Sequence, residues 1–242
     1  MPFDTEAMDF EALLAGPSLA HPFGTDQLGR DTLSRLILGS RVALEVSCGA
    51  VGIGVLIGVP LGLIAVTLRG WVDDIIMRVS DAVAVFPSLL VAVGLAAVLG
   101  NSLGTVIVAI GIANVPYLAR ITRSEGLALR EMEFIAAAEA SGSRLGRIMF
   151  VHILPNALAP VIVQATLGMG YAVLTEAALG FIGVGVQPPT PTWGNMLQEA
   201  FPLLERSPLQ SIVPGMAIFL LVLAFNLLGD ALRDLLDPRS VQ

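Results

Sequence analysis

The sequence predicts an all-α integral membrane protein, and three observations support this prediction. Hydrophobic residues make up 55% of the 242 residues and charged residues only 14%, whereas soluble domains are roughly 25% charged. The mean hydropathy is +0.81. Several long intervals contain no Asp, Glu or Arg, as expected of helices that cross roughly 30 Å of hydrocarbon with about 20 apolar residues.

These intervals predict five membrane spans. We expect them near residues 43–67, 82–99, 104–119, 156–184 and 211–229. The second and third are separated by the turn-like sequence Gly-Asn-Ser-Leu-Gly at residues 100–104. The fourth is too long for one straight helix, so we expect it to be broken or to be preceded by an interfacial piece. Prolines in these runs are tolerated when neighbouring helices satisfy the freed backbone groups.

Arginines concentrate in three segments that share one side of the membrane if the spans alternate. They are the stretch between the first two spans, residues 120–155 and the C-terminal tail, residues 230–242. Because cytoplasmic loops carry an excess of basic residues, we expect this side to be cytoplasmic. The N-terminal segment, residues 1–41, and the loop 185–210 then lie outside. The transmembrane domain between this segment and the tail comprises residues 42–229.

The external N-terminal segment is expected to contain an amphipathic helix. Residues 24–31 have the composition of a turn that leads into it. Its apolar side comprises Leu33, Leu36 and Ile37. Asp31 and Arg35 are four residues apart and can pair on the helix surface. We interpret this helix as lying on the membrane interface, and a contact with substrate is the alternative. Trp193 of the second external segment fits an interfacial anchor.

Composition excludes several classes of function. Every one of the 13 basic residues is Arg, so the chain has no Lys for a nucleotide-binding P-loop or a Schiff base. Cys48 is the sole cysteine and His21 and His152 are the two histidines, which makes a zinc site implausible. The net charge of -7 argues against nucleic acid as a partner. We expect no catalytic residues, no metal and no cofactor.

The interval 120–155 is too polar for lipid and predicts two short helices. The first covers residues 130–140 and includes three consecutive alanines. Gly142 follows at a C′ position, and the second helix begins at Arg144. One interpretation is a solvated connector between spans. The other is a docking element, because an alanine-rich helix is thin enough to enter a groove on a cytosolic partner.

The same interval carries a resemblance to a known family. Residues 133–156, EFIAAAEASGSRLGRIMFVHILPN, resemble the "EAA" loop of permease subunits of bacterial ABC importers. Residues 21–31, 185–194 and 226–238 resemble the C-type permease of the dipeptide, oligopeptide and nickel importers. The similarity extends over residues 21–239, nearly the whole chain.

This resemblance implies a type I ABC importer permease fold in the bacterial plasma (inner) membrane. It implies a heterodimer with a second permease, two cytoplasmic ATPase subunits that supply the energy, and an external substrate-binding protein. The chain itself would not be an enzyme, and the two permeases would form the path for di- or oligopeptides or nickel. The resemblance assigns ATPase coupling to Glu133, Ala137, Ala138, Glu139, Gly142 and Pro155.

Two departures from the family pattern affect these expectations. Ala136 stands where the motif has its glutamate, so the polar contact with the ATPase is expected to differ. Relatives carry a cytoplasmic tail and a first span before the external segment, which gives them six spans. We expect that the start of this chain is truncated or misassigned, and a five-span variant is the alternative.

Two further features concern the spans themselves. Glycines recur every four residues on one helix face and predict close helix packing, within this subunit or against the partner permease: Gly54, Gly58 and Gly62. Glu176 is the one acid deep inside an apolar run. Such carboxylates face a bundle interior or a water-filled path, so Glu176 is a candidate for the translocation path and, alternatively, a packing residue.

Two other classes of function agree less well with the sequence. An ion-coupled secondary transporter that acts without an ATPase usually carries several acidic or histidine residues within its spans, and here Glu176 stands alone. An intramembrane enzyme needs a nucleophile with a base or a metal cluster at one cavity. His152 and Ser141 fall in the polar interval and form no such constellation.

Overall fold

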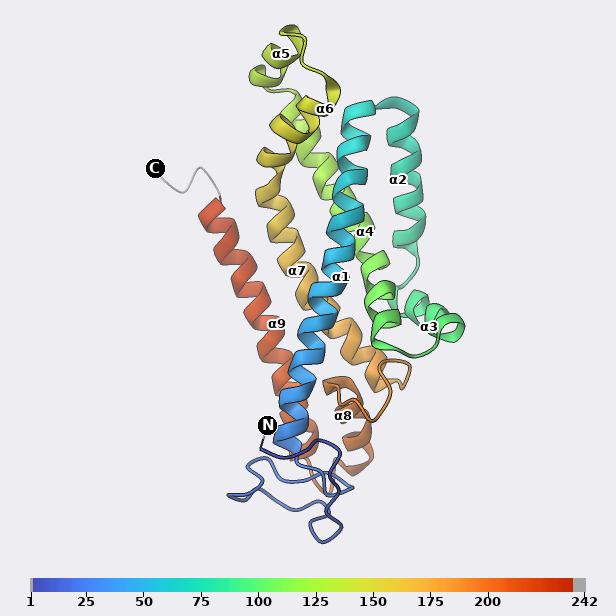
Figure 1. The fold of residues 1–242 in the computed structure, drawn as a ribbon, viewed down its shortest axis with the longest axis vertical. Helices are drawn as coiled ribbons and strands as arrows, with labels where there is room; N and C mark the ends of the chain where they lie inside the picture. Colours follow the sequence, from blue (N-terminus) through green and yellow to red (C-terminus); the bar gives the residue numbers. More distant parts are fainter. Residues whose placement is uncertain (1, 237–242) are drawn as a thin grey trace. The chain divides into compact units, whose positions relative to one another are not determined.

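The computed structural model describes residues 2–236, and this part of the chain is helical apart from turns and an isolated bridge between Thr25 and Asp31 (Figure 1). The all-α prediction is confirmed. The helices are α1 Thr32–Leu68, α2 Gly70–Val85, α3 Ser88–Leu99, α4 Leu103–Arg130, α5 Glu133–Ala140, α6 Leu145–Arg147, α7 Leu154–Phe181, α8 Trp193–Ala200 and α9 Leu209–Leu236. A π-helical stretch, Ile148–Ile153, joins α6 to α7, and a 3-10 turn, Phe201–Leu203, follows α8.

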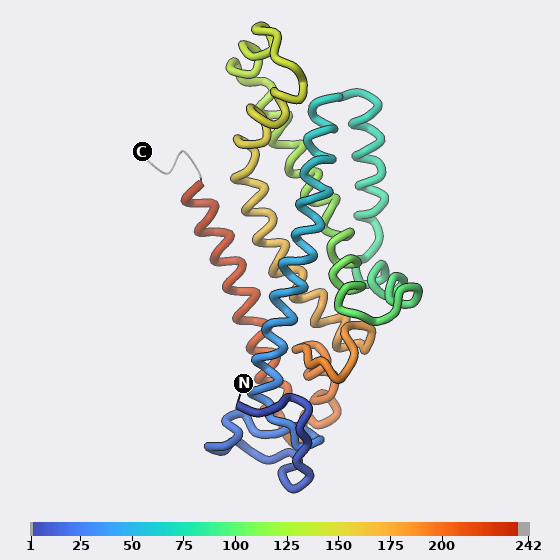
Figure 2. Tube along the Cα trace, viewed as in Figure 1, coloured from blue at the N-terminus to red at the C-terminus, as the bar shows by residue number. Residues whose placement is uncertain are grey.

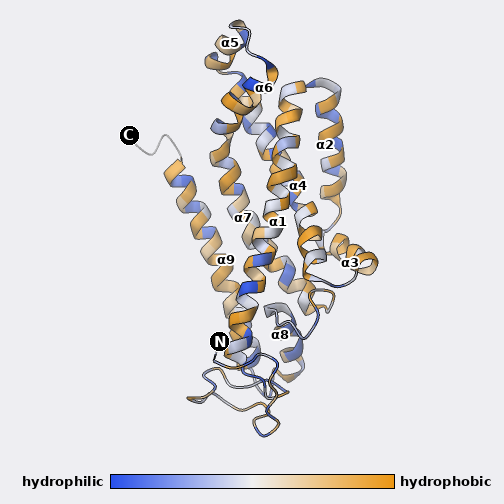
Figure 3. Ribbon diagram, viewed as in Figure 1, coloured by the Kyte–Doolittle hydropathy of each residue, from blue (hydrophilic) through white to orange (hydrophobic). Residues whose placement is uncertain are grey.

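Four helical segments are long and apolar enough to cross a membrane. They are α1, α4, α9 and the run Leu145–Phe181, and the bent pair α2 and α3 adds a fifth if it counts as one span. At 1.5 Å per residue, segments of 28 to 37 residues are about 42 to 55 Å long, which exceeds the hydrocarbon thickness of about 30 Å. Figure 3 shows the hydrophobic colour along these helices.

The prediction that residues 82–99 form a single spanning helix is wrong. α2 begins at Gly70 and ends at Val85, and α3 begins after a break at Phe86 and Pro87. Proline disfavours the helical conformation of the residue before it, and Phe86 is extended, with φ -76° and ψ 127°. In Figure 2, α1 and α2 run antiparallel on either side of the tight turn at residues 68–70.

The polar interval 120–155 is also divided differently from the prediction. α4 continues to Arg130, so residues 120–130 are helical and the connection is confined to residues 131–144. Hydropathy did not predict these helical residues because they are charged, and it takes no account of the acidic partners that Arg120 and Arg123 find on α2. Arg123 donates to Asp73 at 2.5 and 2.6 Å, and an Arg120 nitrogen lies 2.8 Å from Asp81.

The fourth span is entered through an irregular turn, in line with the expectation that it is broken or preceded by another piece. The π-helical stretch ends where the Leu154 N–H donates to Met149 O, five residues back. Pro155 follows directly. Proline has no N–H and its ring collides with the carbonyl four residues before it, so a wider turn accommodates it.

The helix expected after the turn at residues 24–31 is present, but it is the start of a spanning helix and does not lie on the membrane interface. α1 is continuous from Thr32, so the residues of the expected helix form its first turns. Trp193 is not an interfacial anchor, because it is 5% exposed and its Nε1 donates to Leu36 O at 3.0 Å. This contact, together with Gly39 under the Trp193 ring, buries one side of the helix against α8 rather than against lipid headgroups.

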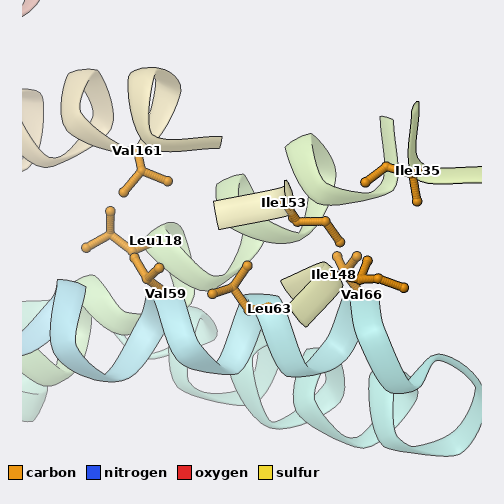
Figure 4. Close-up of a cluster of buried hydrophobic side chains, with 8 residues drawn as sticks. All are labelled: Val59, Leu63, Val66, Leu118, Ile135, Ile148, Ile153 and Val161. Carbon is orange, nitrogen blue, oxygen red and sulfur yellow. The ribbon is translucent and has the colours of Figure 1, made fainter. Parts of the chain in front are cut away.

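The described chain divides into two compact units. The first comprises residues 2–48, 88–110 and 170–223, and the second comprises residues 49–87, 111–169 and 224–236. In the second unit, eight buried side chains from α1, α4, α5, the π-helical stretch and α7 form one apolar cluster: Val59, Leu63, Val66, Leu118, Ile135, Ile148, Ile153 and Val161 (Figure 4).

The C-terminal tail is helical as far as it is described. Residues 230–236 continue α9, so the expected boundary at residue 229 does not coincide with the end of a helix. Residues 237–242, which include Arg239 and the end of the 226–238 motif, lie outside the described residues.

Candidate functional site

The candidate site is the connection between α4 and α6, in the second unit, where the resemblance places ATPase coupling. α5 forms there because its eight residues are mostly helix formers and Glu133 complements the positive end of the helix dipole. Its end is a Schellman motif: Gly142 N–H donates to Glu139 O and Ser143 N–H donates to Ala138 O. Gly142 takes the predicted C′ position with φ +76°, which glycine adopts without strain.

One face of α5 is packed against the rest of the second unit. Ile135 is 1% exposed and belongs to the apolar cluster, beside Val66 of α1 and Ile148 (Figure 4). Glu139 lies one turn further along on the same face, since residues four apart are stacked on a helix. Its carboxylate accepts a hydrogen bond from Arg130 at 2.9 Å.

The opposite face of α5 is open and carries mainly small side chains. Ala136, Ala137 and Ala140 are exposed, as is Glu133 at the start of the helix, whereas Ala138 is half-buried. Alanines leave the helix backbone close to the surface, so another protein can approach it closely. The docking role of this open face stays a prediction.

Pro155 is not brought together with the other predicted coupling residues. It is exposed at the second position of α7, beyond the π-helical stretch, whereas the other five lie within α5 and its C-terminal turn. His152 comes closer, with its ring centroid 6.5 Å from that of Phe134. Ser141 donates to Ala137 O, a bond local to α5.

Arg130 is a site residue that sequence reasoning missed. Its Nη1 donates to the carbonyls of Val66 and Thr67 at 2.8 and 3.3 Å, and its Nη2 donates to Glu139. The sequence feature that could have indicated its role is its position at the end of a helix, where basic side chains interact favourably with the terminal carbonyls. The carbonyls belong to α1, however, more than sixty residues earlier in the chain.

The predicted glycine stripe lies within this unit as well. A Cβ on Gly58 would lie 2.7 Å from Val115 O, and one on Gly62 would lie 2.6 Å from Ala119 O. A Cβ on Gly54 would lie 2.9 Å from the Leu118 side chain and 3.0 Å from the Asn114 Cβ. All these partners belong to α4, so the structure places the stripe against a helix of the same chain and brings α1 and α4 into backbone contact.

A second polar cluster, in the first unit, was also not foreseen. Arg30 and Arg35 both bind Asp26, each at 2.6 Å, and both bind Glu199 of α8, at 2.8 and 3.0 Å. The expected surface pair between Asp31 and Arg35 is therefore replaced. Gln210 of α9 adds a bond to Thr25 O at 2.8 Å. The cluster ties the N-terminal segment to α8 and α9.

Glu176 is 1% exposed in α7 and interacts with the side chain of Thr192. Its Oε1 has no hydrogen-bond partner within the described residues. Thr192 is the N-cap of α8 and forms a reciprocal capping box with Asn195. This position supports the packing interpretation, since Glu176 lies under the start of α8, and the role in the translocation path stays a prediction.

Asp31, just before the first residue of α1, is held in its charged form. Burial raises the pKa of its carboxyl, but hydrogen bonds from His21 and Ser34 outweigh this and hold the pKa below its ordinary value. The Asp31–His21 distance is 2.9 Å and the Ser34 N–H donates at 2.8 Å. A carboxyl whose pKa is lower in the folded state stabilises the fold above its unfolded pKa and loses this contribution as pH falls.

We therefore expect acidification below the ordinary Asp pKa of about 3.9 to destabilise the first unit in part through Asp31. Asp31→Asn should lower the unfolding temperature near neutral pH and flatten its dependence on pH in the acid range. Thermal unfolding in detergent at a series of pH values measures both effects. Glu205→Gln, at an exposed position, is the control, and an equally steep acid dependence in Asp31→Asn would contradict the assignment.

No group of three or more His, Cys, Asp and Glu side chains within residues 2–236 is arranged to hold a metal ion. The structure thus offers spanning helices, a small helix with one open face, and a polar cluster at the N-terminal segment.

Comparison with known proteins agrees with this arrangement. Residues 54–242 match the family described as "Binding-protein-dependent transport system inner membrane component". The dipeptide transport system permease protein DppC of Alkalihalophilus pseudofirmus is 50% identical over 226 residues, 93% of this chain and 74% of that protein. The glutathione transport system permease protein GsiD of Pectobacterium atrosepticum is 43% identical over 240 residues, 99% of this chain and 80% of that protein.

A solved structure of the MetNI methionine ABC transporter in an inward facing conformation has the same fold. Its matching chain has a TM-score of 0.70 at 19% identity, over 85% of this chain and 98% of that one. The helical bundle and these relatives define a multi-pass permease of an inner membrane transport system, not an enzyme. The chain belongs to the family of binding-protein-dependent transport system inner membrane components. The predicted resemblance and ABC importer permease fold are confirmed.

Proposed function

We propose that this permease belongs to an ATP-driven importer and forms, with a second permease, the translocation path for dipeptides or closely related small peptides. The observation that carries the proposal is the 50% identity to a dipeptide permease over 93% of the chain, joined by similarity to a glutathione permease over 99%. Glutathione is itself a small peptide, so both relatives point to one chemical class. Longer peptides and nickel are the competing cargoes.

The open face of α5 is the proposed contact with a cytoplasmic ATPase subunit. Glu133, Ala137 and the turn at Gly142 would meet the ATPase, since they lie at the exposed surface of this small helix. Ala138 is half-buried and Glu139 binds Arg130, so these two would act from the packed face. Because the Glu139 carboxylate is already bonded to Arg130 and Ala136 has no charge, we expect this contact to depend on shape more than on a carboxylate.

The proposed orientation places α5 in the cytoplasm and the N-terminal segment outside, facing an external substrate-binding protein. Three crossings separate them when α2 and α3 count as one span, so they fall on opposite sides. Arginines flank α5 on both sides, at Arg130, Arg144 and Arg147, as the positive-inside rule requires of a cytoplasmic segment.

Uptake by reconstituted vesicles tests this function. The complex purified from the native host in mild detergent is inserted into vesicles with its binding protein, and labelled dipeptide, glutathione, longer peptide and nickel ion are supplied in separate arms. We expect ATP-dependent accumulation of dipeptide or glutathione. Accumulation of a longer peptide or nickel alone would overturn the cargo class. Uptake by the solitary chain, driven by an ion gradient, would reject the ATP-driven role.

The same vesicles test the contact surface. Ala137→Trp puts a bulky side chain on the open face of α5, so we expect ATP hydrolysis to continue while uptake falls several-fold. Ala97→Trp, at an exposed position of α3, is the matched control and should leave coupling unchanged. Normal coupled uptake in Ala137→Trp would remove α5 as the docking surface.

A further inference from the structure

Arg130 joins three helices at one end of the second unit. It is the last residue of α4, and its side chain is 14% exposed. Its Nη1 donates to both Val66 O and Thr67 O in the last turn of α1. The carbonyls of a final turn have no partner within their own helix, so Arg130 satisfies two acceptors that would otherwise face water or lipid.

The other part of the same guanidinium holds α5. Nη2 donates to Glu139 Oε1 at 2.9 Å, and the Glu139 side chain is 44% exposed. Apart from this bond, the packed face of α5 is held by Ile135, which lies beside Val66 in the apolar cluster. The ionic attachment and the Ile135 side chain thus both link α5 to the last turns of α1, while Ile135 also packs with Ile148 of the π-helical stretch.

The geometry demands arginine in particular. A planar guanidinium presents donors along separate edges and can bridge a pair of carbonyls and a carboxylate at once. A lysine ammonium is a point charge on a flexible stem and would have to favour one partner. The neighbouring pair Arg69–Glu131 is no substitute, since it is 3.5 Å long with side chains 49% and 80% exposed, and such pairs contribute little.

We propose that Arg130 is the positioning residue through which movement of α5 is passed to α1. This inference rests on the proposed function, because it assumes that an ATPase displaces α5. A displacement of α5 would move Glu139, then the Arg130 guanidinium that is bonded to it, and then the last turn of α1. α1 carries the motion onward together with α4, because Gly58 and Gly62 hold the two helices in backbone contact.

Gly126 supports the geometry of the junction. It lies one turn before Arg130 on α4, and a Cβ there would come 2.9 Å from the Val66 side chain and 3.3 Å from that of Ile153. The absence of a side chain lets α4 approach the end of α1. This closeness places the Arg130 guanidinium within hydrogen-bond distance of carbonyls on a helix other than its own.

The test is a double-mutant cycle in the reconstituted complex. Arg130→Gln, Glu139→Gln and the double variant are compared by the amount of dipeptide imported per ATP hydrolysed. We expect each single change to lower this ratio by roughly 2- to 30-fold, the range for residues that transmit coupling. The double variant should be no worse than Arg130→Gln, because both remove the same link. Arg130→Lys should restore part of the ratio.

Glu131→Gln is the control, since it breaks an exposed ion pair at the same junction and should leave the ratio unchanged. If Arg130→Gln does not fold, Glu139→Gln decides alone, because it is nearly isosteric at a half-exposed position. An unchanged ratio in Glu139→Gln, or strictly additive effects, would overturn the inference. If the unmodified complex shows no ATP-driven import, the proposed function fails instead, so the two failures are distinguishable.

A distance measurement gives a readout that is independent of transport. In a Cys48→Ser background, spin labels at Ala136 of α5 and Leu68 at the end of α1, both exposed, report the separation of the two helices. We expect one narrow distance distribution for the unmodified pair and a broad one in Arg130→Gln. Equally narrow distributions would show that Ile135 suffices to hold α5 and would overturn the proposal.

Discussion

Replacing Gly62 by leucine is expected to leave little folded protein in the membrane. A Cβ at this position would lie 2.6 Å from Ala119 O and 2.7 Å from the Thr122 Cβ, so even the first added carbon collides with α4. The nearest obstacle is a backbone carbonyl, which cannot swing aside as a flexible side chain would. Excess volume in a packed interior costs about 1–3 kcal/mol or more, and a leucine here forces the helices apart.

Folded yield and thermal unfolding in detergent measure this effect. Gly52→Leu is a matched control on the same helix, because no atom lies within 4 Å of a Cβ built there. We expect Gly52→Leu to retain most of the folded yield and Gly62→Leu to lose it. Similar yields for the two variants would mean that α1 and α4 do not pack through the glycine stripe.

Glu199→Ala is expected to have the second largest effect, on the first unit. The change leaves Arg30 and Arg35, whose side chains are 8% and 3% exposed, with Asp26 as their one remaining acidic partner among residues 2–236. Removing one partner from a buried ion pair typically costs about 3–5 kcal/mol, because the remaining charge is desolvated without compensation. The Arg35 Nε already lacks a hydrogen bond within the described residues, so spare partners are scarce.

The expected result is a lower unfolding temperature together with faster proteolysis within the N-terminal segment, which the cluster ties to α8. Glu45→Ala is the control, since it breaks an ion pair with Arg41 whose side chains are 42% and 75% exposed. Exposed pairs contribute about 1 kcal/mol at most, so this variant should change little. Equal effects of the two substitutions would show that burial does not strengthen the cluster.

Both predictions concern how the helices are held, and the function depends on the same contacts. Under the proposed function the permease transmits movement over long helices, so the close α1–α4 contact and the attachment of α5 would serve both stability and coupling. This is why the tests of coupling use substitutions at half-exposed positions such as Glu139, whereas Gly62 and Glu199 report on folding.

The sequence by itself determined the features that depend on neighbouring residues. Apolar runs long enough for the bilayer predicted the membrane class and the approximate number of spans, because each span buries its own backbone hydrogen bonds. Gly142 predicted the end of α5, because only glycine adopts φ +76° without strain. The spacing of Gly54, Gly58 and Gly62 predicted a packed face, since small residues every four positions share one side of a helix.

Only the tertiary structure decided where charged helices run and which side chains meet. Residues 70–81 and 120–129 were predicted to be connections because of their charges, yet they are helical, and Asp73 and Arg123 neutralise each other between α2 and α4. Arg30 and Glu199 are 169 residues apart, and nothing local indicates their pairing. Hydropathy scores each residue alone, whereas the cost of burying a charge depends on a partner that only the folded chain supplies.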